Sequence, residues 1–93
     1  MAKSVIQEGN ECCVCGNPNT EEHHVLYGTA NRKLSDKYGY VVRLCPEHHR
    51  GNCGVHFDRG LDLHLKRLAQ KHFEEHHGTR ADFIALFGRN YLD

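Results

Sequence analysis

The sequence predicts a small α+β fold in which a β-β-α core is followed by C-terminal helices. Two short segments, HHVLYG and YGYVVRLC, have the apolar and β-branched composition of strands. Pro46 directly follows Cys45, as is typical of the first position of a helix. The last third of the chain repeats its apolar residues at helical intervals. These observations place two strands and a short helix ahead of a helical tail.

The composition limits the size of the core. The chain has 93 residues, 39% hydrophobic content and no Trp, so burial alone is a weak source of stability and a disulfide, a structural metal or a partner subunit is expected. Five Cys residues, an odd number, disfavour a closed disulfide framework. No apolar run resembles a secretory signal or a membrane span. We therefore expect one cytoplasmic domain with reduced thiols and no membrane partner.

The segment between the strands, TANRKLSDKYG, is polar and indicates a turn-rich loop. The helix that begins at Pro46 should be brief, because GNCG at 51–54 interrupts it. We assign residues 10–57 to the core and residues 58–93 to the tail.

The tail predicts two helices. Asp58 or Asp62 is a start signal for the first, whose apolar face comprises Leu61, Leu65, Leu68, Ala69, His72 and Phe73. Gly78 is its stop signal, and the Thr79–Asp82 spacing of a capping box opens the second helix. His72 should pack in the core, whereas His64, His76 and His77 should be solvated. FGRNYL should dock onto the core, and the tail as a whole packs on the strands or makes a homodimer contact.

Four residues have the spacing of a zinc site. Cys12 and Cys15 form a C-x2-C pair before a glycine, and Cys45 and His48 form a C-x2-H pair that shares one helical face. Zinc prefers four sulfur or nitrogen ligands in a tetrahedron. The two pairs therefore predict one structural Zn²⁺ site.

Two other cysteines leave alternatives. Cys13 should point away from the knuckle, which makes it a spacer. Cys53 is an alternative to His48 as the fourth ligand. The remaining alternative is that the cysteines are buried or unpaired without a metal.

A second group of histidines surrounds the predicted zinc site. If EEHHV is a strand and CPEHHR a helix packed across it, His23 and His49 face each other and can hold a divalent ion through imidazole nitrogens. Successive strand residues point to opposite faces, so His24 is left to act as a base. A metal and a base are the parts that phosphodiester hydrolysis needs. The alternative is that these histidines are incidental.

The run from Cys12 to His56 resembles the HNH endonucleases of the ββα-metal class, in particular those with a zinc-bound treble clef encoded by phages and prophages. The motifs are C-x2-C, a His-His pair on a strand, and L-C-x2-[CH]-H at the start of a helix. The resemblance covers roughly half of the chain. It implies that His23 and His49 bind the catalytic metal, that His24 is the general base, and that His56 completes the site.

The sequence departs from the family pattern in two places. His49 and His56 are seven residues apart, about 10 Å along a straight helix, so GNCG must fold the chain back for both to bind one metal. The family's middle Asn is expected where this chain has Gly39 and Tyr40. Asn31 is the substitute that the preceding loop offers.

The charges are distributed unevenly, although the formal net charge is zero. Residues 31–50 hold five basic residues against two acidic ones, and residues 8–22 hold four Glu and no basic residue. The basic surplus is consistent with a phosphate-contacting surface or with an ordinary solvated loop. For the first interpretation, the residues we assign to phosphate contacts are Arg32, Lys33, Arg43 and Arg50. A neutral chain attracts DNA weakly, so binding should be sensitive to salt and helped by a partner. The resemblance implies that this partner is a phage packaging protein such as a terminase.

Three hypotheses follow for function. The first is a DNA endonuclease that uses Mg²⁺, Mn²⁺ or Ni²⁺ beside structural Zn²⁺, in a bacterial host cell. The second is a zinc-bound module that binds nucleic acid or protein without catalysis. The third is a small oligomeric adaptor in which the C-terminal helices dominate. The triplet of His23, His24 and His49 favours the first, because a purely structural zinc domain does not require it.

Overall fold

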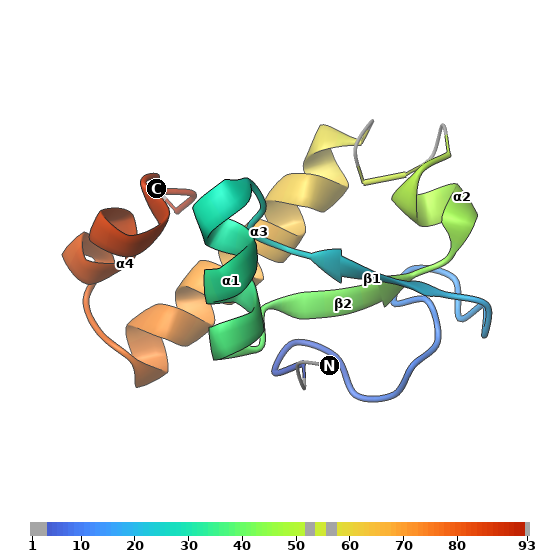
Figure 1. The fold of residues 1–93 in the computed structure, drawn as a ribbon, viewed down its shortest axis with the longest axis horizontal. Helices are drawn as coiled ribbons and strands as arrows, with labels where there is room; N and C mark the ends of the chain where they lie inside the picture. Colours follow the sequence, from blue (N-terminus) through green and yellow to red (C-terminus); the bar gives the residue numbers. More distant parts are fainter. Residues whose placement is uncertain (1–3, 52–53, 56–57, 93) are drawn as a thin grey trace.

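The computed structural model describes residues 4–51, 54–55 and 58–92. Its elements are, in chain order, β1 (Glu21–His24), α1 (Thr29–Tyr38), β2 (Val41–Leu44), α2 (Pro46–His49), α3 (Arg59–His76) and α4 (Arg80–Phe87). The strands form an antiparallel two-stranded sheet in which Glu21 lies opposite Leu44 and His24 opposite Val41. Figure 1 shows α1 and α2 at opposite ends of the sheet, α3 crossing behind it and α4 beyond α1. The predicted small α+β fold is confirmed.

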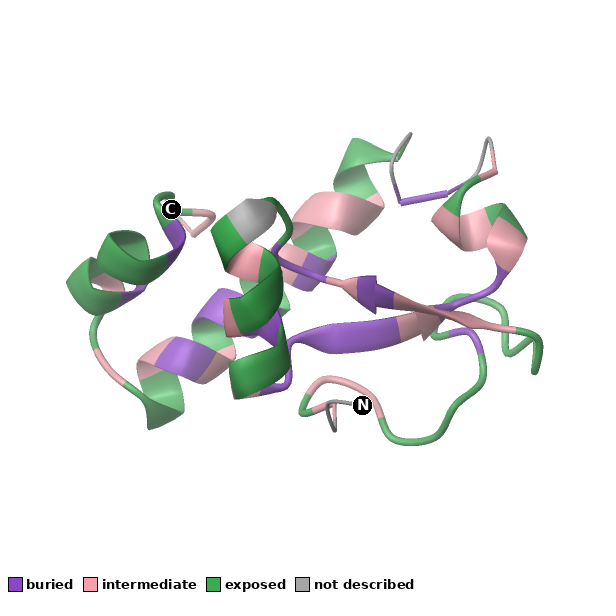
Figure 2. Ribbon diagram, viewed as in Figure 1, coloured by how far each residue is buried: buried purple, intermediate pink, exposed green. Residues whose placement is uncertain are grey.

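The core lies between the sheet and the inner faces of the long helices (Figure 2). Strand β2 is buried at Val41, Val42 and Leu44, consistent with its β-branched sequence. The same core cluster contains Leu65, Ala69 and Phe73 of α3 and Phe83 and Phe87 of α4. Within the described residues, no helix is both long and apolar enough to cross a bilayer.

The predicted helix signals of the tail are confirmed. Asp58 caps α3 by accepting a hydrogen bond from the Leu61 N–H at 3.1 Å. Thr79 and Asp82 form a complete capping box at the start of α4. Leu68 departs from the expected apolar face, because its side chain is 39% exposed.

The predicted loop between the strands is wrong, because residues 29–38 form helix α1. Its polar composition concealed an inward stripe at Leu34, Ser35 and Tyr38, in which Tyr38 lies one helical turn after the other two residues. The Ser35 hydroxyl donates to the Leu26 carbonyl at 2.6 Å and accepts from the Leu26 N–H at 3.2 Å. Gly39 ends the helix at φ 80°, a left-handed conformation that favours glycine. Tyr38 therefore belongs to this helix and not to the predicted strand.

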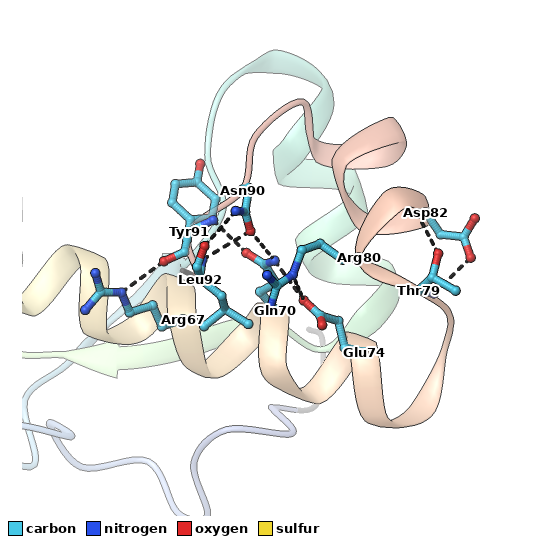
Figure 3. A network of polar contacts seen from close by, with 9 residues as sticks. All are labelled: Arg67, Gln70, Glu74, Thr79, Arg80, Asp82, Asn90, Tyr91 and Leu92. Atoms are coloured by element: carbon cyan, nitrogen blue, oxygen red, sulfur yellow. Dashed lines mark hydrogen bonds and ion pairs between the residues drawn. The ribbon is translucent and has the colours of Figure 1, made fainter.

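The C-terminal segment docks onto α3 through buried Gln70, as Figure 3 shows. Its side-chain amide donates to Asn90 Oδ1 at 2.8 Å and accepts from the Tyr91 N–H at 2.7 Å. Arg67 Nε donates to the Tyr91 carbonyl at 3.0 Å. These bonds fix residues 90–91 beside the helix, as the sequence predicted for FGRNYL.

We predict that Gln70→Met lowers the free energy of unfolding by about 1–3 kcal/mol, because it leaves the Tyr91 N–H and the Asn90 amide without their buried partner. Met fills a similar volume, so the loss should not come from a cavity. Chemical denaturation measures the change. Lys71→Met, on the exposed surface of the same helix, is the control and should change stability by less than about 0.5 kcal/mol. Equal stability of the two variants would contradict the prediction.

Candidate metal centre and histidine cleft

The four predicted zinc ligands, Cys12, Cys15, Cys45 and His48, come together with all their ligand atoms within 4.8 Å of one another. Cys15 Sγ lies 3.7 Å from Cys45 Sγ, and His48 Nδ1 lies 3.8 Å from Cys12 Sγ and 3.1 Å from Cys45 Sγ. A tetrahedral zinc with bonds of ~2.0–2.3 Å places its ligand atoms ~3.5–3.8 Å apart. Two of the three distances match this spacing and the distance between Cys45 and His48 is shorter; the group could hold Zn²⁺.

Local backbone structure presents these ligands. The Gly16 N–H donates to the Cys12 carbonyl at 2.8 Å, and Gly16 adopts φ 79°, which turns the knuckle. The Cys13 N–H donates to the Arg43 carbonyl at 2.9 Å, so the knuckle is fastened to β2. Cys45 is the N-cap of α2, which places His48 in its first turn. The cluster therefore joins the N-terminal knuckle to the end of the sheet.

The thiols of the knuckle differ in acidity. Burial opposes ionisation of Cys12, but hydrogen bonds from backbone N–H groups, beginning with that of Cys45, outweigh it and lower its pKa to about 6. Desolvation and the charge of Cys12 raise the pKa of Cys13 to about 11. Because zinc binds thiolates, this contrast favours Cys12 over Cys13 as a ligand. A hydrogen bond from the Asn17 backbone lowers the pKa of Cys15, but desolvation and the hydrogen bonds to Cys12 and Cys45 outweigh it and raise that pKa, so the assignment of Cys15 as a ligand depends on its position in the cluster.

We predict that Cys15→Ala abolishes stoichiometric zinc binding and unfolds the domain, because structural zinc contributes on the order of 10 kcal/mol to the folding of small zinc domains. Mass spectrometry measures the zinc content, and circular dichroism measures the loss of folded structure. Cys13→Ala is the matched control, because it also removes one thiol from the same knuckle. This variant should retain one zinc per chain. Loss of zinc from both variants would contradict the assigned ligand set.

A second cluster lies in a cleft of about 330 Å³. Its lining residues are Glu22, His23, His24, Tyr27, Arg32, His49 and Arg50. The rings of His23 and His49 meet edge to face with centroids 5.3 Å apart. His23 is buried, whereas His24 and His49 are partly exposed. The structure thus brings three of the four histidines predicted for the site into one cleft.

Glu21 orients the His49 ring. The Glu21 carboxylate accepts a hydrogen bond from His49 Nδ1 at 2.8 Å and forms an ion pair with Arg50 at 2.6 Å. The hydrogen bond from His49, supported by Arg50, holds the pKa of Glu21 below its ordinary value. Because the proton of His49 is on Nδ1, its Nε2 atom carries the lone pair that a cation can bind.

His24 has different neighbours from those of His23. Its Nε2 atom lies 2.9 Å from Asp36 Oδ1 on α1 and 3.7 Å from Glu22 Oε1. Glu22, His24 and Asp36 form a group that could hold another metal. Sequence analysis missed the two carboxylates around His24. The i, i+2 spacing of Glu22 and His24 on a strand could have indicated that Glu22 lies beside His24. The position of Asp36 could be inferred only after α1 was known.

The other predicted site residues are distributed more widely. Arg32 and Arg50 line the cleft, while Lys33 is exposed on α1 and Arg43 pairs across the sheet with Glu22. The predictions for His56 and Cys53 concern residues outside the described ranges.

Residues given other predicted roles are also located. Asn31 does not brace the cleft, because its side chain donates to the Phe87 carbonyl at 3.2 Å and so joins α1 to the end of α4. His72 packs beside Tyr40, with its Nδ1 atom 3.2 Å from the phenol oxygen. His64, His76 and His77 are exposed, as expected.

Comparison with protein families, with curated proteins and with solved structures finds no match to this chain. The assignment of function therefore depends on the chemistry of the two clusters.

Proposed function

We propose that the protein is a metal-dependent endonuclease of the HNH type, which hydrolyses DNA phosphodiester bonds in the histidine cleft. The observation that carries the proposal is the pairing of His23 and His49 at 5.3 Å beside His24 and two arginines, in a single solvent-accessible cleft. Imidazole nitrogens bind divalent cations, and guanidinium groups bind phosphate. These are the groups that phosphodiester hydrolysis requires.

Each residue has a separate role in this proposal. His23 and His49 would hold Mg²⁺, Mn²⁺ or Ni²⁺, with Glu21 fixing the His49 ring from behind. When bound, such a cation supplies positive charge for the pentavalent phosphate of the transition state. Arg32 and Arg50 line the cleft and would contact the phosphate oxygens that flank the scissile bond.

His24 would take a proton from the attacking water. Hydrogen bonding of its Nε2–H to Asp36 leaves the lone pair on Nδ1, so Nδ1 is the basic atom in this tautomer. A competing role follows from the same geometry, because Glu22, His24 and Asp36 together could bind a cation themselves. Removal of the His24 imidazole should leave metal affinity unchanged if His24 is a base and should lower it if His24 is a ligand.

The first prediction of this proposal concerns His24→Ala. The variant should nick supercoiled plasmid at least about 100-fold more slowly than the parent, because the base is lost, while zinc content and affinity for the second metal are unchanged. Gel assays with added Mg²⁺, Mn²⁺ or Ni²⁺ measure nicking, and calorimetry with Mn²⁺ measures affinity. His64→Ala, which removes an exposed imidazole from α3, is the control.

The outcomes separate the alternatives. Loss of Mn²⁺ affinity in His24→Ala would make His24 a ligand rather than a base. Unaltered nicking by this variant would refute its catalytic role. A folded, zinc-loaded parent that binds DNA but never cuts it would favour the non-catalytic binding module.

The second prediction concerns Glu21. Glu21→Gln should weaken binding of the second metal about 10- to 100-fold, because the ring of His49 loses its anionic hydrogen-bond acceptor. Calorimetric titration of zinc-loaded protein with Mn²⁺ measures the change. Glu8→Gln, at an exposed position of the N-terminal segment, is the control and should bind as the parent does. Equal affinities of both variants would show that Glu21 does not support a ligand.

DNA recruitment is part of the proposal. The formal net charge of zero gives little long-range attraction to DNA, so a partner such as a phage packaging protein would raise the local DNA concentration. A homodimer formed through α3 and α4 would serve the same purpose by presenting two clefts.

A further inference from the structure

A second cavity, of about 300 Å³, lies between the first half of α3 and the C-terminal segment. Four of its lining residues are basic: Arg59, Lys66, Arg67 and Arg89. Its acidic lining residue, Asp62, forms an ion pair with Lys66 at 2.9 Å. Throughout the described ranges, Arg59, Arg67 and Arg89 form no ion pair with a carboxylate. The groove therefore carries positive charge that is not compensated locally.

The position of Arg59 does not serve helix stability. Arg59 is the first residue of α3, where the helix dipole disfavours a positive charge. Its side chain is exposed, as are those of Arg67 and Arg89. Guanidinium groups in an open groove are suited to binding phosphate oxygens.

The groove adjoins the histidine cleft. Tyr27 lines the cleft, and Lys66 Nζ lies 4.3 Å from the centre of the Tyr27 ring. On its other side Lys66 lies 5.3 Å from the ring centre of Tyr91, which lines the groove. The Tyr27–Lys66 contact is thus a wall shared by the two cavities. The far wall is held in place by the Gln70 bonds to Asn90 and Tyr91 (Figure 3).

We propose that this groove binds the phosphate backbone of a nucleic acid strand whose neighbouring phosphodiester lies in the histidine cleft; this inference rests on the proposed function. The cations of the groove would extend the track of positive charge that begins at Arg32 and Arg50. Backbone contacts of this kind set position on DNA without reading its sequence.

The test measures binding rather than cleavage. The R59Q/R89Q double variant is compared in the His24→Ala background, with zinc bound and no other divalent ion added, by anisotropy of a short fluorescent DNA duplex. Each lost phosphate contact should weaken binding about 3- to 8-fold at about 0.1 M salt and reduce the slope of log K against log salt by about 1. The double variant should therefore bind at least about 10-fold more weakly than the parent. The magnitude of its salt slope should be smaller by about 2.

The matched control is K37Q/K71Q, which removes the same charge at exposed positions that do not line the groove. Equal weakening in both double variants would overturn the proposal, because it would reflect net charge alone. Unchanged binding by R59Q/R89Q would overturn it as well. A third arm uses vesicles of phosphatidylcholine with phosphatidylglycerol, and loss of vesicle binding with unchanged duplex binding would assign the groove to lipid headgroups instead. Failure of the parent to nick plasmid, together with groove-dependent binding, would refute the nuclease and leave the groove in place.

Discussion

The Cys3His cluster is the interaction on which the rest of the structure depends. It closes a contact between residues 33 positions apart, from Cys12 to Cys45, and so holds the N-terminal knuckle against the end of β2. The sheet has two strands of four residues each, and such a sheet is marginal in water without further packing. A zinc ion bound at this junction would fix the start of α2. Because His49 directly follows the ligand His48, the same junction sets the position of the cleft.

Strand alternation then divides the neighbours of β1 between two helices. Glu21 and His23 are two residues apart and meet His49 of α2, whereas His24 meets Asp36 of α1 and its strand neighbour Glu22. Two adjacent histidines can therefore differ in chemistry without any difference in residue type. A one-residue slip of the register would exchange their environments, so the pairing of His24 with Val41 matters for the site as well as for the sheet.

Signals that act over a few residues were sufficient to predict much of this fold. The cysteine pairs, the Cys45-Pro46 helix start and the Thr79 capping box depend on local geometry, and each is found where the spacing placed it. Helix α1 could not be predicted in the same way, because its stabilising bonds join Ser35 to the backbone of Leu26, across the turn that follows β1. The carboxylate nearest His24 was missed for the same reason.

The two clusters differ in how firmly they can hold a metal, and this difference follows from their chemistry. Three thiolates and an imidazole complete a tetrahedron and leave no position open, which suits a structural zinc that stays bound. Two imidazoles in an accessible cleft supply only part of a coordination shell, so water and phosphate oxygens can fill the remainder. If both metals bind as proposed, the zinc site would form first, because it lies at the start of the helix that carries His49. Exchange of a second metal in the cleft would then leave the fold intact.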